Sequence, residues 1–263
     1  ILSVATPRRR WSALFSIRMA GVPAGGAAAA VVATGLATDH SWRAGLGALA
    51  LAPMLCAAFL LVAARRWRGG PRSVVRLGAV LSPRNIATPF ATLRRAPGLA
   101  RLTFASAGFA MVQGGGFAFL TTYLVHGVGL TLPLAGALFA TMQGASFLGR
   151  IAMGVAAARL GSARRVLIRL GLAAAGGAVL LTLAHPAAPT PLLFLGAAVA
   201  GVAIASWNGL LMACIAEAAP KGEVAAATSA ATFFTFLAYM ATPLAFAAVS
   251  VALGYRAAYL LSA

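Results

Sequence analysis

The chain has 263 residues, of which 61% are hydrophobic and only 9% are charged. This composition excludes an ordinary water-soluble domain, which needs more polar surface, and it favours a protein embedded in a lipid bilayer. The net charge of +18 would suit a nucleic-acid binder, but nearly all Lys and Arg residues lie in short connectors between apolar stretches, so we expect no nucleic-acid partner.

Long apolar runs predict an all-α fold, namely a polytopic bundle of transmembrane helices. A bilayer core about 30 Å thick requires about 20 apolar residues in each spanning helix. An eighth run begins near Tyr255 and is too short to span, so we expect full spans followed by a C-terminal stub. The seven full spans are predicted at residues 13–36, 44–64, 102–126, 132–157, 166–184, 192–216 and 224–251.

Basic residues follow an alternating pattern along the connectors. One set of connectors is rich in them, at residues 8–10, 65–101, 158–165 and 221. The other set holds only Arg43 and Arg256. Since cytoplasmic connectors are rich in Lys and Arg, the pattern places the N-terminal tail and the 65–98 segment in the cytoplasm. That segment is rich in proline, glycine and arginine, which predicts a linker, and any short helix in it would lie at the anionic headgroups.

The turn after the fourth predicted span carries the most informative motif. Its sequence is GRIAMGVAAARLGSARR, at residues 149–165. A glycine at position 154 permits close helix packing, and Gly161 suits a tight left-handed turn. The turn resembles a cytoplasmic loop signature of the major facilitator superfamily, through Gly154, Arg159, Gly161, Arg164 and Arg165. The alternative is an ordinary positive-inside turn.

One position departs from the family signature. Ala158 stands where the signature has Asp, which removes the carboxylate that a gating ion pair at this position would need.

Three other segments are similar to helices of the same superfamily. RMAGVPAGG at 18–26 resembles the start of helix 5, SWRAG at 41–45 the start of helix 6, and ASWNGLLMACIAEAAP at 205–220 helix 10 and its exit. The resemblance implies helices 5 to 12 of a bacterial permease, cut at both ends, with helices 1 to 4 as missing partners. It implies three parts: the last two helices of the N-terminal half (1–64), a cytoplasmic linker (65–98), and a C-terminal half with an incomplete last helix (99–263).

The resemblance implies a secondary transporter that moves a small solute across the bacterial inner membrane by alternating access. The alternative is a membrane-embedded interaction or sensor protein that does not transport. The sequence contains no GxSxG, HExxH or GxxxxGK[ST] motif and only three acidic residues, so we expect no enzyme. Cys56 and Cys214 lie far apart without a His or Cys at ligand spacing, so we expect no metal or other cofactor.

Polar and aromatic residues inside the predicted spans are the candidates for the solute pathway, because a polar group in hydrocarbon usually faces a cavity or a partner. The candidates are Gln113, Phe117, Gln143, Arg150, Trp207 and Asn208. Gln143 and Arg150 share one helix face with Gly154. Arg150 is a candidate contact for an anion, and the alternative is that it snorkels to the cytoplasmic end or braces the turn.

Two features of the predicted spans allow more than one role. Trp207 and Asn208 suit either a solute contact or an interhelical hydrogen bond. The run Gly114 to Gly116, beside Gln113, suits either a bend in a gating helix or close packing of neighbouring helices.

Overall fold

The computed structural model describes residues 7, 10–66, 82–220 and 222–263. In that part, seven helical segments are long and apolar enough to cross a membrane, which confirms the predicted all-α transmembrane bundle. They are Trp11–Asp39, Trp42–Ala64, Pro97–Gly127, Leu132–Leu160, Ala163–Thr182, Thr190–Ala218 and Val224–Leu253. The predicted C-terminal stub is a short helix after the last of these segments.

The helices extend the predicted spans by a few residues at most ends. Their bounds are α2 Trp11–Asp39, α3 Trp42–Arg66, α5 Pro83–Arg95, α6 Pro97–Thr122, α7 Leu132–Leu160, α8 Ala163–Thr182, α9 Thr190–Ala205, α10 Asn208–Ala218, α11 Val224–Leu253 and α12 Tyr255–Ser262. A π-helical turn, η2 (Tyr123–Gly127), continues α6.

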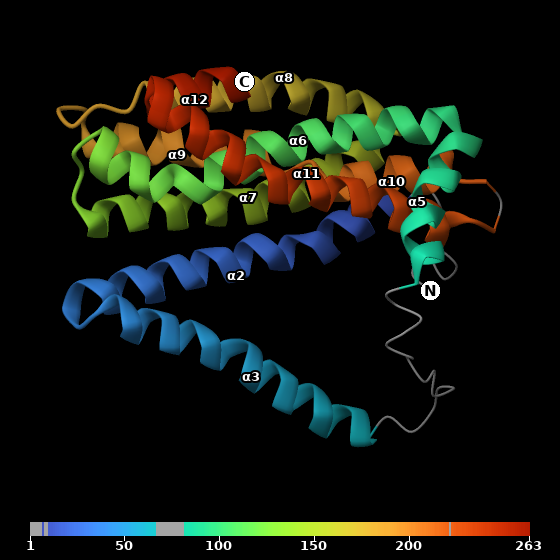
Figure 1. The fold of residues 1–263 in the computed structure, drawn as a ribbon, viewed down its shortest axis with the longest axis horizontal. Helices are drawn as coiled ribbons and strands as arrows, with labels where there is room; N and C mark the ends of the chain where they lie inside the picture. Colours follow the sequence, from blue (N-terminus) through green and yellow to red (C-terminus); the bar gives the residue numbers. More distant parts are fainter. Residues whose placement is uncertain (1–6, 8–9, 67–81, 221) are drawn as a thin grey trace.

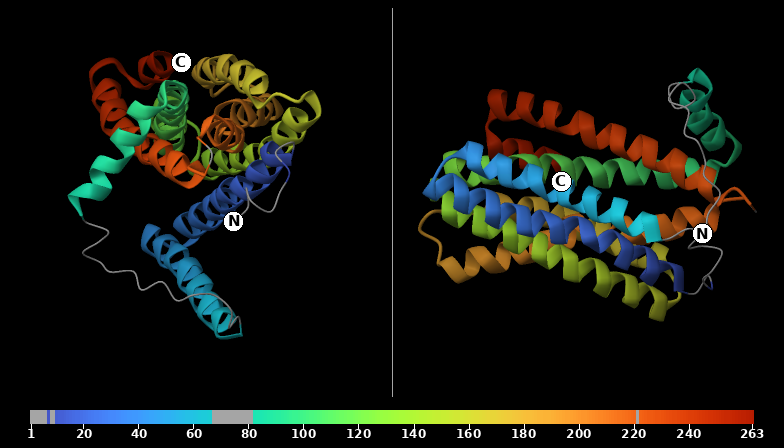
Figure 2. Two further views of the ribbon diagram at one scale, coloured as in Figure 1. Left: turned by 90° about the vertical axis from the view of Figure 1, so that its right-hand side faces the viewer. Right: turned by 90° about the horizontal axis from the view of Figure 1, so that it is seen from below.

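Helices α6 to α12 form one bundle, and α2 lies along α7 with its first turns against α10 (Figure 1). Helix α3 turns back beside α2 and then diverges from the bundle, as the left-hand view of Figure 2 also shows. None of the most apolar stretch of α3 is buried within the described chain. A helix that is apolar on all sides needs lipid or protein around it, so α3 presents its surface to the bilayer or to an apolar partner.

Proline and glycine set several of the helix ends. A proline lies in the first turn of α6, α7 and α9, where its missing N–H costs nothing. Gly161 ends α7 with φ of 63°, the left-handed conformation expected of it, and its N–H bonds the Ala157 carbonyl. The next residue, Ser162, caps α8 by accepting a hydrogen bond from the Arg165 N–H.

The structure departs from the predicted spans at one place, and it contains a short helix in the predicted linker. The predicted span 192–216 is not one helix, because the chain leaves the helical path at Ser206 and Trp207 between α9 and α10. The predicted linker contains α5, which packs on α11 through an edge-to-face contact between Phe90 and Phe234 at 4.9 Å. Residues 67–81 of the predicted linker lie outside the described residues, and so do Arg8, Arg9 and Lys221.

Candidate functional site

The interruption between α9 and α10, here called the α9–α10 break, lies inside a membrane-spanning segment. Helix α9 ends at Ala205, Ser206 and Trp207 are buried, and α10 begins at Asn208. Backbone groups released from a helix in hydrocarbon need partners from the protein, because no water is there to bond them. The residues that contact the break are therefore the first candidates for a functional site.

Arg150 of α7 supplies one such partner. Its side chain is only 1% exposed, and Nε donates a hydrogen bond of 2.8 Å to the Ala205 carbonyl. Its Nη1 donates to the Met19 carbonyl of α2. Met19 lies four residues before Pro23, and a proline has no N–H to bond that carbonyl. Arg150 thus bonds one carbonyl at a helix end and one that lacks its helical donor.

These contacts bear on one of the roles expected for Arg150, namely snorkelling. A snorkelling arginine would extend along the lipid surface to the helix end, whereas this side chain lies inside the bundle. The snorkelling interpretation is therefore wrong. Arg150 instead joins α2, α7 and the α9–α10 break.

Arg150 lies without a nearby carboxylate in the described part of the chain. The three acids of the sequence lie at helix ends: Asp39 ends α2, Glu217 is in the last turn of α10, and Glu223 precedes α11. Glu217 lies at the end of α10 that is farther from Ala205 along the chain. The guanidinium has five N–H donors, of which two bond carbonyls here.

Several buried polar groups on α2, α7 and the α9–α10 break have no hydrogen-bond partner within the described residues. They are Ser16 Oγ, Gln143 Oε1, Ser146 Oγ and Ser206 Oγ. Gln143 and Ser146 share the Arg150 face of α7, and Ser206 follows the bonded Ala205 carbonyl. A buried polar group without a partner costs about 1–3 kcal/mol, so this cluster is suited to bind a polar molecule.

Glycines bring the three elements of this cluster into contact. A Cβ added to Gly154 or Gly209 would collide with Ser16 of α2, and one added to Gly149 would collide with Ser206. Larger residues at these positions would push α2, α7 and α10 apart. Gly154 of the loop motif therefore acts in the packing of α2 on α7.

Trp207 occupies the other side of the α9–α10 break. Its ring stacks on Phe109 of α6 with centroids 5.3 Å apart, and its Nε1 donates a 3.0 Å hydrogen bond to Gln113 Oε1. Trp207 and Gln113 are both buried. The interhelical hydrogen bond expected as one role for Trp207 is thus present, and it ties the break to α6.

The other candidates take no part in the hydrogen bonds of Arg150 and Trp207. Phe117 packs edge to face on Phe139 of α7 at 5.8 Å. Gln143 lies against Gly26 of α2, about two turns from Arg150 along α7. Asn208 is half-buried, and its side chain has no hydrogen bond to any residue that the structure describes. The structure therefore brings Gln113, Arg150 and Trp207 to the two sides of one break, and it leaves Phe117 and Asn208 outside those contacts.

The remaining loop-motif residues form the turn between α7 and α8. Arg159, Arg164 and Arg165 are exposed there. Arg165 Nη2 lies 3.5 Å from the Leu160 carbonyl, where it helps to cap the end of α7.

Glycines 114 to 116 pack against α11 and α12. A Cβ on Gly115 would meet the Phe246 ring at 2.7 Å, and the Gly116 carbonyl accepts a 2.9 Å hydrogen bond from the Tyr259 hydroxyl. Helix α6 continues through all three. Of the two roles expected for this run, the structure shows close packing and no break at the glycines.

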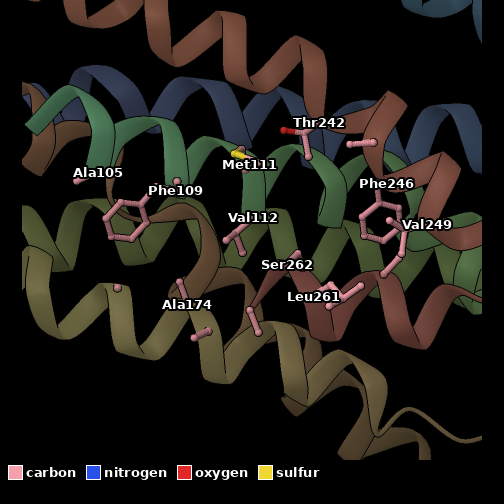
Figure 3. Close-up of a pocket in the computed structure, with 16 residues that line it drawn as sticks. Ala105, Phe109, Met111, Val112, Ala174, Thr242, Phe246, Val249, Leu261 and Ser262 are labelled. Carbon is pink, nitrogen blue, oxygen red and sulfur yellow. The ribbon is translucent and has the colours of Figure 1, made fainter. Parts of the chain in front are cut away.

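A cavity of about 510 Å³ lies between α6, α8, α11 and α12, with Phe109, Val112 and Phe246 in its wall (Figure 3). Its hydroxyl groups already have partners, because Thr242 donates to the Ala238 carbonyl and Ser262 to the Tyr259 carbonyl. This lining offers little to a polar solute, so the cluster at the α9–α10 break is the better candidate site.

Inspection of the sequence missed several residues of the site. Ser146 carries a usable signal, because it lies three residues after Gln143 and four before Arg150 on one helix face. Ser16, Ser206 and Phe109 carry no comparable pattern. The Met19 and Ala205 carbonyls have no side-chain signal, although Pro23 indicates that the first lacks its helical donor.

Comparison with known proteins supports the family assignment that the loop motif suggested. The family described as Major Facilitator Superfamily matches residues 1–243. No curated protein gave a significant match. The family match covers most of the chain, and the described residues contain seven segments long and apolar enough to span a membrane, so the chain belongs to the major facilitator superfamily of membrane transporters.

Proposed function

We propose that this protein is a secondary transporter that moves a small solute across the bacterial inner membrane by alternating access. The observation that carries the proposal is the buried polar cluster around Arg150 at the α9–α10 break. Transporters commonly bind their solute near the bilayer midplane at interrupted helices, where one half of the protein meets the other.

The proposed division of the chain makes this cluster a contact between two halves. Residues 1–64 would belong to the N-terminal half, 65–98 to the linker and 99–263 to the C-terminal half. Arg150 then joins the two halves, because it lies on α7 and bonds the Met19 carbonyl of α2. A solute that binds Arg150 would compete with this bond and so favour a rearrangement of the halves.

The proposed orientation places the N-terminal tail and the linker in the cytoplasm. At that end of the bundle the described arginines are exposed and numerous: Arg10, Arg94, Arg95, Arg101, Arg159, Arg164 and Arg165. The opposite end carries Arg43 and Arg256. An excess of this kind is typical of the cytoplasmic face.

Arg150 also favours one class of solute, namely small anions such as carboxylates. The guanidinium keeps unused N–H donors, and serine hydroxyls beside it are free to donate. A negative charge would lower the cost of holding a cation in the bundle. Trp207 and Gln113 would then form one wall of the site and hold its shape.

Uptake into proteoliposomes tests the proposal, with the protein as its gene encodes it and a panel of radiolabelled carboxylates, inorganic phosphate and neutral sugars. We expect uptake of at least one anion, and a loss of about tenfold or more in Arg150→Gln, because a hydrogen bond to a charged group contributes about 1.5–3 kcal/mol. Arg18→Gln is the matched control, since Arg18 is exposed on α2.

Two results would count against the proposal. Equal uptake of every anion by Arg150→Gln and Arg18→Gln would exclude the anion contact. No uptake of any solute by a folded wild-type protein would favour the interaction or sensor protein instead.

A further inference from the structure

Arg169 lies in an unusual position for a charged residue. It belongs to the membrane-spanning segment Ala163–Thr182, and its side chain is exposed on the outside of the bundle. Its neighbours on that surface are apolar and exposed, since Ile168 is 57% and Leu172 76% exposed. A charge at the lipid surface of a span is costly, so the guanidinium is expected to reach the headgroup region or an anionic group there.

An apolar groove lies directly beside Arg169. It has a volume of about 590 Å³ and runs between α7, α8 and α9. Its lining includes Met153, Leu160, Leu170, Val199 and Val202. Arg169 is the charged residue in this lining, which contains no carboxylate.

The depth of Arg169 matches the headgroup region of a lipid. It follows the start of α8 by six residues, or about 9 Å of helix, and an arginine side chain is long enough to reach the interface from there. The exposed arginines of the α7–α8 turn, Arg159, Arg164 and Arg165, lie at the same end. Together they give this end of the groove a positive potential.

We propose that this groove binds an anionic phospholipid of the cytoplasmic leaflet. The phosphate lies on Arg169, and an acyl chain fills the apolar groove toward Val199 and Val202. The choice of leaflet rests on the orientation given under the proposed function. A basic group at the end of an apolar groove between helices is the arrangement that selects an anionic lipid over a zwitterionic one.

The groove lies behind the candidate solute site. Val202 lines the groove, and a Cβ on Gly149 would also meet its side chain at 3.1 Å. Gly149 precedes Arg150, and Val202 lies one turn before Ser206 of the α9–α10 break. A lipid in the groove therefore packs against the wall that holds the break, and it stabilises the contact of α7 with α9.

Native mass spectrometry of the detergent-purified protein tests this proposal, with phosphatidylglycerol and phosphatidylcholine of identical acyl chains. We expect wild type to retain phosphatidylglycerol in preference to phosphatidylcholine. Arg169→Gln should lose this preference by about fivefold, the effect of one arginine at an anionic headgroup. Arg18→Gln should keep it, because Arg18 is exposed on α2, away from the groove.

A second variant tests whether the apolar part of the groove holds an acyl chain. Ala173 lines the groove and is exposed, so Ala173→Trp fills the groove without disturbing the core. We expect it to weaken the binding of both lipids. Equal loss in Arg169→Gln and Arg18→Gln, or unchanged binding in Ala173→Trp, would overturn the proposal. Displacement of the lipid by millimolar inorganic phosphate would overturn it also, because the site would then bind the anion alone. Lipid binding is measured without transport, so a failure to bind lipid can be distinguished from a failure of the proposed transport function.

Discussion

Arg150 on α7 donates a hydrogen bond to the Met19 carbonyl on α2, the carbonyl that Pro23 leaves without a helical donor. The same guanidinium bonds the Ala205 carbonyl at the end of α9. One buried side chain thus bonds two backbone carbonyls that lack a helical donor, one within α2 and one at the end of α9, and in doing so it holds three elements together.

Replacement of Arg150 by methionine should destabilise the protein. Both carbonyls would lose a charge-assisted donor inside the bundle, at a cost of about 3 kcal/mol in the free energy of unfolding. Arg150→Lys should be more stable than Arg150→Met but less stable than wild type, because one ammonium group cannot donate to both carbonyls with the geometry of the guanidinium fork. Thermal unfolding in mild detergent measures the effect, and a methionine variant as stable as wild type would contradict it.

Pro23→Ala should reduce the cost of Arg150→Met. An alanine at 23 has an N–H that can bond the Met19 carbonyl, so this carbonyl no longer depends on Arg150. We expect the two changes to be non-additive by about 1 kcal/mol in a double-mutant cycle. Additive effects would show that the Met19 carbonyl does not depend on Arg150.

Gly154 and Gly144 of α7 should respond differently to alanine. A Cβ at Gly154 would overlap Ser16, whereas Gly144 has nothing within 4 Å of such an atom. We expect Gly154→Ala to lower the free energy of unfolding by about 1–3 kcal/mol through overpacking, and Gly144→Ala to be neutral or slightly stabilising. The same unfolding assay compares them, and an equal response would contradict the close approach of α2 and α7.

Trp207→Phe alone should lower the free energy of unfolding more than the paired change, in which Trp207→Phe and Gln113→Leu are combined. Phenylalanine keeps the stacking on Phe109 but leaves the Gln113 amide buried without its partner, a cost of about 1–3 kcal/mol. The paired change removes that amide. A paired variant less stable than the single one would show that Gln113 has another essential contact.

The helices could be predicted from the sequence to a large degree because the bilayer fixes their length. Each apolar run predicted to be long enough to cross a bilayer corresponds to a candidate membrane span in the structure. Gly161 ends α7 in the left-handed conformation that glycine adopts without strain. The α9–α10 break was not predicted, because Ser206, Asn208 and Gly209 stand as single small or polar residues between two strongly apolar runs, and together these runs are long enough for one span.

The candidate site could be predicted only in its residue types. Gln113, Arg150 and Trp207 are visible as polar or large residues within apolar runs. The hydrogen-bond partners of Arg150 could not be predicted, because they are backbone carbonyls on helices distant in sequence. Proximity to a helix end along the chain suggested snorkelling, but the packing of α2 against α7 buries the side chain instead.

Thiol labelling at the α9–α10 break measures whether this segment is reached from both sides of the membrane, as alternating access requires. The native cysteines Cys56 and Cys214 are first replaced by serine, and Ser206→Cys is then introduced. If the break faces each side of the membrane in turn, the introduced thiol reacts with a membrane-impermeant reagent added from either side of sealed vesicles, and the transported solute slows both reactions. A thiol that is unreactive from both sides, in a protein that still transports, would contradict a solute pathway through the break.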